Sequence, residues 1–127
     1  MTREELEQIY YLIRELALLE RELKRLRGIS PIQSPLPNAS HGSGVSDKVG
    51  NAAARIVDLE TNIEQLKKTV VEVLDFIEQI PDAQMRIIVK SHCAEKDDWN
   101  KTLEKLGEKA TLDGIKKRYY RFLKKTF

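Results

Sequence analysis

A heptad run over residues 46–80 constrains the fold of this chain more than any other feature of the sequence. From Leu59 onward its apolar residues return at alternating steps of four and three, and the run stops at Pro81. This period keeps one apolar stripe of a helix against a partner helix, as in a coiled coil. At 1.5 Å per residue the helix would be roughly 50 Å long. Such a rod needs a partner to cover its stripe.

A second long helix is predicted over residues 2–27. Thr2 and Glu5 have the spacing of a capping box, and Gly28 follows the basic last turn as a helix stop. Its stripe continues with leucines in heptad steps, which are Leu12, Leu16, Leu19, Leu23 and Leu26. The two helices are therefore expected to form an antiparallel helical hairpin over residues 1–80. A lone hairpin would leave much of both stripes in water, which favours a homodimer formed through the coiled coil.

The connection over residues 28–46 is rich in Pro, Gly and Ser. Its histidine, His41, has no partner residues with metal-ligand spacing and is expected to be exposed. Cys93 is the single cysteine of the 127 residues, which excludes an internal disulfide and fits a reducing compartment. No apolar run approaches the ~20 residues that cross a bilayer, and the acidic N-terminus does not read as a signal peptide. These features predict a cytoplasmic protein without a membrane segment.

The last third, residues 81–127, is predicted to be a small three-helix head with the outline of a helix-turn-helix. Asp82, Asp98 and Thr111 are placed as helix N-caps, and Gly107 as a helix stop. The predicted helices cover residues 83–94, 99–106 and 112–126. Their expected inward residues are Ile87, Ile88 and Ala94 or Cys93 in the first, Trp99, Leu103 and Leu106 in the second, and Ile115, Tyr119, Phe122 and Leu123 in the third. The predicted fold is therefore all-α.

The final predicted helix concentrates positive charge. Its six cations stand against one acid, Asp113, so the segment carries +5 while the whole chain carries +2. Four of them share a face opposite the apolar stripe, and such a face can meet the phosphates of duplex DNA. The first turn, residues 112–117, would approach base edges if the helix entered a major groove. The predicted DNA-binding residues are Lys116, Lys117, Arg118, Arg121, Lys124 and Lys125. The alternative is a solvated basic face near a helix C-terminus, where cations are favoured anyway.

The sequence shows no sign of an enzyme. It has no glycine-rich phosphate loop, no serine elbow and no metal-ligand spacing. His92 and Cys93 are adjacent, so they point to different sides of a helix, and packing is the expected role of both. We therefore predict no catalytic residue, no cofactor and no metal.

Three stretches of the chain resemble a family of phage and prophage proteins of Gram-positive bacteria, the sigma-factor-like transcriptional regulators of the ArpU and RinA type. The first is Gly42–Asn51 with Ala54–Glu60, and the second is Ile80–Ile88. The third joins Trp99, Leu106-Gly107, Ile115, Tyr119 and Phe122-Leu123, and it is similar to the helix-turn-helix of sigma factor region 4. The resemblance implies a DNA-binding transcriptional regulator in the cytoplasm of a bacterial host cell.

The chain departs from that family pattern at several positions. His92-Cys93 replaces an Arg-Tyr pair, Thr102 stands where the family has an aliphatic residue, and Gly114 lies inside the expected recognition helix. The helix-turn-helix is therefore degenerate. This leaves open an alternative function as a protein–protein interaction module without DNA readout, whose partner would be host RNA polymerase or another phage protein. A third reading is a small DNA-packaging subunit.

Overall fold

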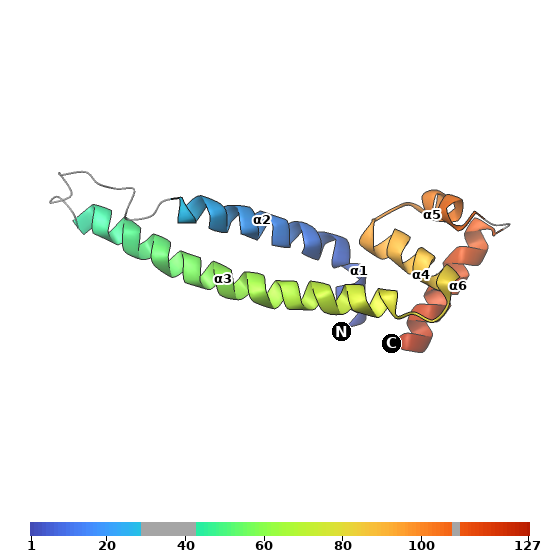
Figure 1. Ribbon diagram of the computed structural model, residues 1–127. Coiled ribbons are helices and arrows are strands. Elements are labelled where there is room, and N and C mark those ends of the chain that lie inside the picture. The colour runs from blue at the N-terminus through green and yellow to red at the C-terminus, as the bar shows by residue number, and fades with distance from the viewer. Residues whose placement is uncertain (29–42, 108–109) are drawn as a thin grey trace. The chain divides into compact units, whose positions relative to one another are not determined.

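The computed structural model describes residues 1–28, 43–107 and 110–127, with the backbone alone for residues 43–50. Its elements are α1 (Arg3–Glu7), α2 (Ile9–Arg27), α3 (Ser43–Glu78), α4 (Ala83–Val89), the π-helical turn η3 (Lys90–Ala94), α5 (Trp99–Leu106) and α6 (Leu112–Thr126). The predicted all-α fold is confirmed: α2 and α3 pair as a long hairpin, and short helices pack together at the C-terminal end (Figure 1). None of the described helices combines the length and apolar character needed to cross a membrane.

The chain divides into two compact units. We call Met1–Ile13 with Lys68–Phe127 the head unit, and Arg14–Lys67 the hairpin unit. The prediction placed one boundary at residue 80, whereas the contacts group residues 1–13 with residues 68–127. The N-terminus is therefore part of the head unit and not only of the hairpin.

The hairpin unit is held together by its apolar seam. Leu23, Leu26, Leu59 and Ile63 form its buried core, with half-buried leucine and isoleucine residues packed around them. Two ion pairs link the helices, Arg27 to Glu60 at 3.0 Å and Arg55 to Glu22 at 3.1 Å. Both pairs are exposed, and exposed pairs contribute only about 0–1 kcal/mol. Most of the stabilisation therefore comes from the seam.

The head unit buries a larger apolar core. Leu6 and Ile9 near the N-terminus are fully buried, as are Val73 of α3 and Ile88 of α4. The helices α4, α5 and α6 contact one another. From α6 the buried residues are Ile115, Tyr119 and Leu123. This core fixes which face of α6 points inward, and so which face is exposed.

The helix ends match the local signals in the sequence. Thr2 forms the predicted capping box with Glu5. Asp82, Asp98 and Thr111 each cap the helix that follows with a side-chain oxygen. Gly107 ends α5 at φ 64°, a left-handed conformation that glycine adopts without steric cost. These five predictions are confirmed.

Other predictions about the helices differ from the structure. The first helix is interrupted at Gln8, and α3 begins at Ser43 instead of residue 46. The predicted helix 83–94 is α-helical only to Val89 and then continues as η3. Ile87 was expected inside and is exposed, because α4 turns its neighbour Ile88 to the core. His41 and most of the predicted 28–46 connection lie outside the described residues.

Candidate nucleic-acid interface

The predicted interface lies on α6, and the head unit holds that helix in place along its length. Thr111 caps its N-terminus by accepting from the Gly114 backbone N–H at 3.0 Å. Near its other end, the ring of Phe122 contacts Phe76 of α3, with ring centroids 6.3 Å apart. A helix anchored at both ends and along one buried stripe presents its opposite face in a fixed orientation.

The outer face of α6 carries cations one turn apart. Lys117, Arg121 and Lys124 are all exposed and stand four and three positions apart, opposite the buried Tyr119. Lys125 is exposed beside them, whereas Lys116 is exposed nearer to the buried side. Among the described residues, no ion pair involves Lys116, Arg121, Lys124 or Lys125. These four cations therefore remain available to an anionic partner.

The other two cations have carboxylate partners in the head unit. Lys117 pairs with Asp113 at 3.0 Å, and both side chains are largely exposed. A helical pair of this kind is worth about 0.3–0.5 kcal/mol, so a phosphate can replace Asp113 at little cost. Arg118 is half-buried and donates to Asp82 at 3.4 Å, while Asp82 also caps α4. We therefore assign Arg118 to the orientation of α6 against α4.

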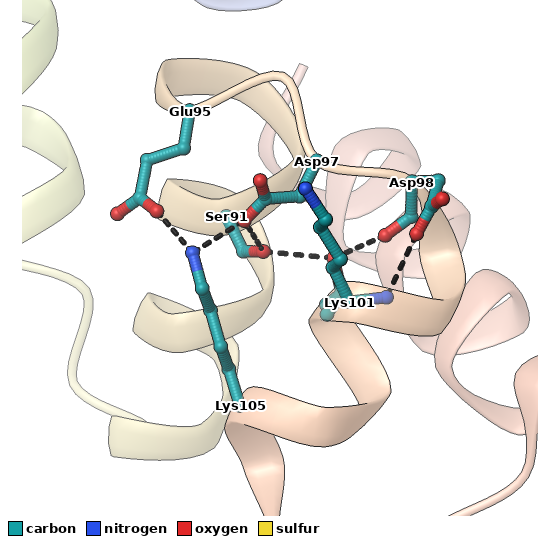
Figure 2. A network of polar contacts seen from close by, with 7 residues as sticks. Ser91, Glu95, Asp97, Asp98, Lys101 and Lys105 are labelled. Carbon is teal, nitrogen blue, oxygen red and sulfur yellow. Dashed lines mark hydrogen bonds and ion pairs between the residues drawn. The ribbon is translucent and has the colours of Figure 1, made fainter.

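A polar network holds α5 against η3 (Figure 2). The Ser91 hydroxyl donates to Asp97 at 2.8 Å and lies 2.9 Å from the hydroxyl of Thr102, and both Ser91 and Thr102 are buried. Lys105 of α5 reaches the carboxylates of Glu95 and Asp97. The buried hydroxyls bond to one another, so polar groups help to fix the position of α5 at Thr102.

Asp97 gives this network a pH dependence. Hydrogen bonds from Lys105 and then Ser91 lower the pKa of Asp97. In the unfolded chain the pKa of Asp97 is about 3.9, and in the folded protein it is lower. The ionised carboxylate therefore stabilises the fold at pH values above about 3.9, and this stabilisation is lost as the pH falls through the pKa of the folded state. We expect Asp97→Asn to melt below the wild type at neutral pH, and the gap to shrink below about pH 4. Melting curves of both proteins, recorded by circular dichroism across this pH range, test the prediction. A difference in melting temperature that does not change with pH would contradict it.

Aromatic side chains form a further contact between η3, α5 and α6. The imidazole of His92 stacks on Trp99, with ring centroids 4.0 Å apart and planes 14° apart, and Tyr119 meets both rings edge-on. The Tyr119 hydroxyl lies 3.2 Å from the sulfur of Cys93, and burial raises the pKa of both groups. Burial, and then the charge of Lys96, lower the pKa of His92. His92 is therefore mainly a neutral packing residue at neutral pH.

Two features of this region were not predicted from the sequence. Tyr120 is exposed on α6 beside the cations. The spacing of the apolar stripe could have predicted this, because the stripe passes through Tyr119 and leaves Tyr120 outside it. Thr102 is fully buried, whereas Trp99, Leu103 and Leu106, which were expected inside, are half-buried. No local pattern in the sequence identifies Ser91 as the partner of Thr102.

The described part of the chain contains no group of three or more His, Cys, Asp or Glu side chains that could hold a metal ion. Models of known protein families, curated proteins and solved structures were compared with the chain, and none of them matches. The resemblance to sigma-factor-like phage regulators therefore stays a prediction from the sequence.

Proposed function

We propose that this protein binds duplex DNA through α6 and dimerises through the α2–α3 coiled coil. Its role would be that of a phage-type transcriptional regulator, as the sequence resemblance implies. The observation that carries the proposal is the exposed row of Lys117, Arg121 and Lys124, directly opposite the stripe that anchors α6. Charge placed on a rigid helix face suits a regular array of phosphates.

Phosphate contacts predict a steep dependence of binding on salt. If Lys117, Arg121, Lys124 and Lys125 each neutralise one phosphate, log K falls with log[salt] at a slope of about −3.6. Affinity then drops about 150-fold between 50 and 200 mM salt. Fluorescence anisotropy of a labelled duplex over this range tests the proposal. Binding that is insensitive to salt, or no binding at 50 mM, would reject it.

The hairpin unit supports the dimer. Leu16, Leu19 and Ile56 lie beside its buried core but are only half-buried themselves. Two helices can cover only part of each other's stripe, so a second copy would bury the remainder. We expect light scattering to report twice the chain mass of 14.7 kDa. The chain mass itself, measured at concentrations up to about 100 μM, would contradict this part of the proposal.

A protein–protein interaction module remains the second candidate. The observation that favours it is the exposure of Leu18 at 61% and Val57 at 62%, both on the hairpin unit. Apolar side chains of this size on a helix surface can join a partner helix. Recovery of one host or phage protein on the immobilised chain, despite nuclease and high salt, would favour this candidate. A matched Leu18→Glu/Val57→Glu variant should then lose that partner while it keeps its helicity.

A further inference from the structure

The head unit contains a cavity of about 210 Å³ beside the basic helix. His92, Tyr119 and Tyr120 give it aromatic walls, and Glu7, Lys96 and Asp97 give it polar groups. An apolar cavity of about 150 Å³ is large enough to hold benzene. The volume therefore suits one flat ring system of the size of a nucleobase and is small for a drug-sized ligand.

The groups around this cavity have features that packing alone does not explain. The Nδ1 atom of His92 is buried and, among the described residues, has no hydrogen-bond partner. A buried polar atom without a partner calls for an explanation such as a ligand. Lys96 has a positive φ of 57°, and η3 is a π-helical turn. Both kinds of backbone irregularity concentrate at functional sites.

The side of the cavity formed by Tyr120 adjoins the cations of α6. Tyr120 is 54% exposed. On a helix, positions three and four residues away are neighbours, and for Tyr120 these include Lys116, Lys117 and Lys124. An exposed aromatic ring with three lysines around it combines stacking for a base with charge for its phosphates, as in proteins that bind single strands.

We propose that the cavity receives an unpaired nucleobase of the bound DNA, which stacks on Tyr120 while the neighbouring lysines hold its phosphates. The Oε1 atom of Glu7 accepts from Arg3 at 3.2 Å, so its other carboxylate oxygen can accept from an exocyclic amino group, and Lys96 offers a donor to a base acceptor. The inference rests on the proposed DNA binding and adds the kind of DNA that the head unit prefers. That DNA is a duplex with one nucleotide out of the stack.

The test compares two labelled duplexes of the same sequence, one fully paired and one with a single unpaired adenine. We expect the wild type to bind the second about tenfold more tightly at 0.1 M salt, the effect of one stacked base. Tyr120→Ala should reduce this preference to about twofold or less, because it removes the ring on which the unpaired base stacks. With 2-aminopurine as the unpaired base, its fluorescence should change on binding to the wild type and not to Tyr120→Ala.

The control is Phe127→Ala at the C-terminal end of α6, which removes a half-exposed ring that packs against Phe76 and does not line the cavity. It should keep the full preference. Equal binding of both duplexes by the wild type would overturn the cavity assignment and leave the proposed duplex binding intact. Loss of the preference in Phe127→Ala as well would overturn the role of Tyr120. If micromolar free adenosine monophosphate displaces the duplex with the unpaired base, the cavity binds free nucleotides and not a base within a DNA strand, and the proposal is wrong. Absence of all DNA binding would overturn both proposals.

Discussion

Replacing Lys117 and Arg121 together with alanine is expected to weaken duplex binding about 60-fold at 0.1 M salt. Each lost phosphate contact reduces the number of counterions released on binding by about 0.9. The slope of log K against log[salt] should therefore flatten from about −3.6 to about −1.8. Between 50 and 200 mM salt, the affinity of the variant should fall only about 12-fold. Both side chains are exposed, so the fold should not change. Anisotropy titrations at four or five salt concentrations measure both quantities.

The matched control is Lys67→Ala/Lys68→Ala on α3. It removes the same amount of charge from exposed positions outside α6. The slope for this control should stay within about 0.5 of the wild-type value if α6 is the interface. Equal losses in the two double variants would mean that only net charge matters. An unchanged slope in the Lys117/Arg121 variant would remove α6 from the interface.

Leu6→Ala should destabilise the head unit by about 2–5 kcal/mol. Leu6 is 0% exposed and belongs to the head unit. The substitution leaves a cavity that the neighbouring core can close only in part. Because Trp99 is the single tryptophan and lies in the head unit, its fluorescence during urea unfolding reports this unit directly. The midpoint of thermal unfolding should fall by roughly 10 °C.

Leu18→Ala is the control for that experiment. It makes the same chemical change on α2, but at a side chain that is largely exposed, so the free energy of unfolding should change by about 0.5 kcal/mol or less. If the two variants unfold alike by Trp99 fluorescence, residues 1–13 are not part of the head core. A large loss for Leu6→Ala alone would show that residues 1–13 are required for a stable head unit.

Several elements were predictable because the signals that set them are local. A capping side chain acts on backbone N–H groups two or three residues away, so Thr2, Asp82, Asp98 and Thr111 mark helix starts without knowledge of the fold. Gly107 marks an end for the same reason. The apolar stripe of α6 has a helical period, and it correctly placed Ile115, Tyr119 and Leu123 inside.

Other features depended on what the fold places opposite each helix. Thr102 is an unfavourable core residue by type, yet it is buried because Ser91 brings a hydroxyl to it and Asp97 completes the network. Ile87 is apolar and exposed because Ile88 and Val89 already fill the core side of α4. In each case the spacing of the residues in their own helix could not reveal what would lie opposite.

The sequence by itself determined the helices, most of their ends and the face of α6 that carries the cations. These follow from interactions within a few residues and from the helical period. Only the tertiary structure decided that residues 1–13 form one unit with residues 68–127, and that Glu7, His92 and Tyr120 line one cavity. Burial and cavities arise where distant segments meet, and no local periodicity records which segments those are.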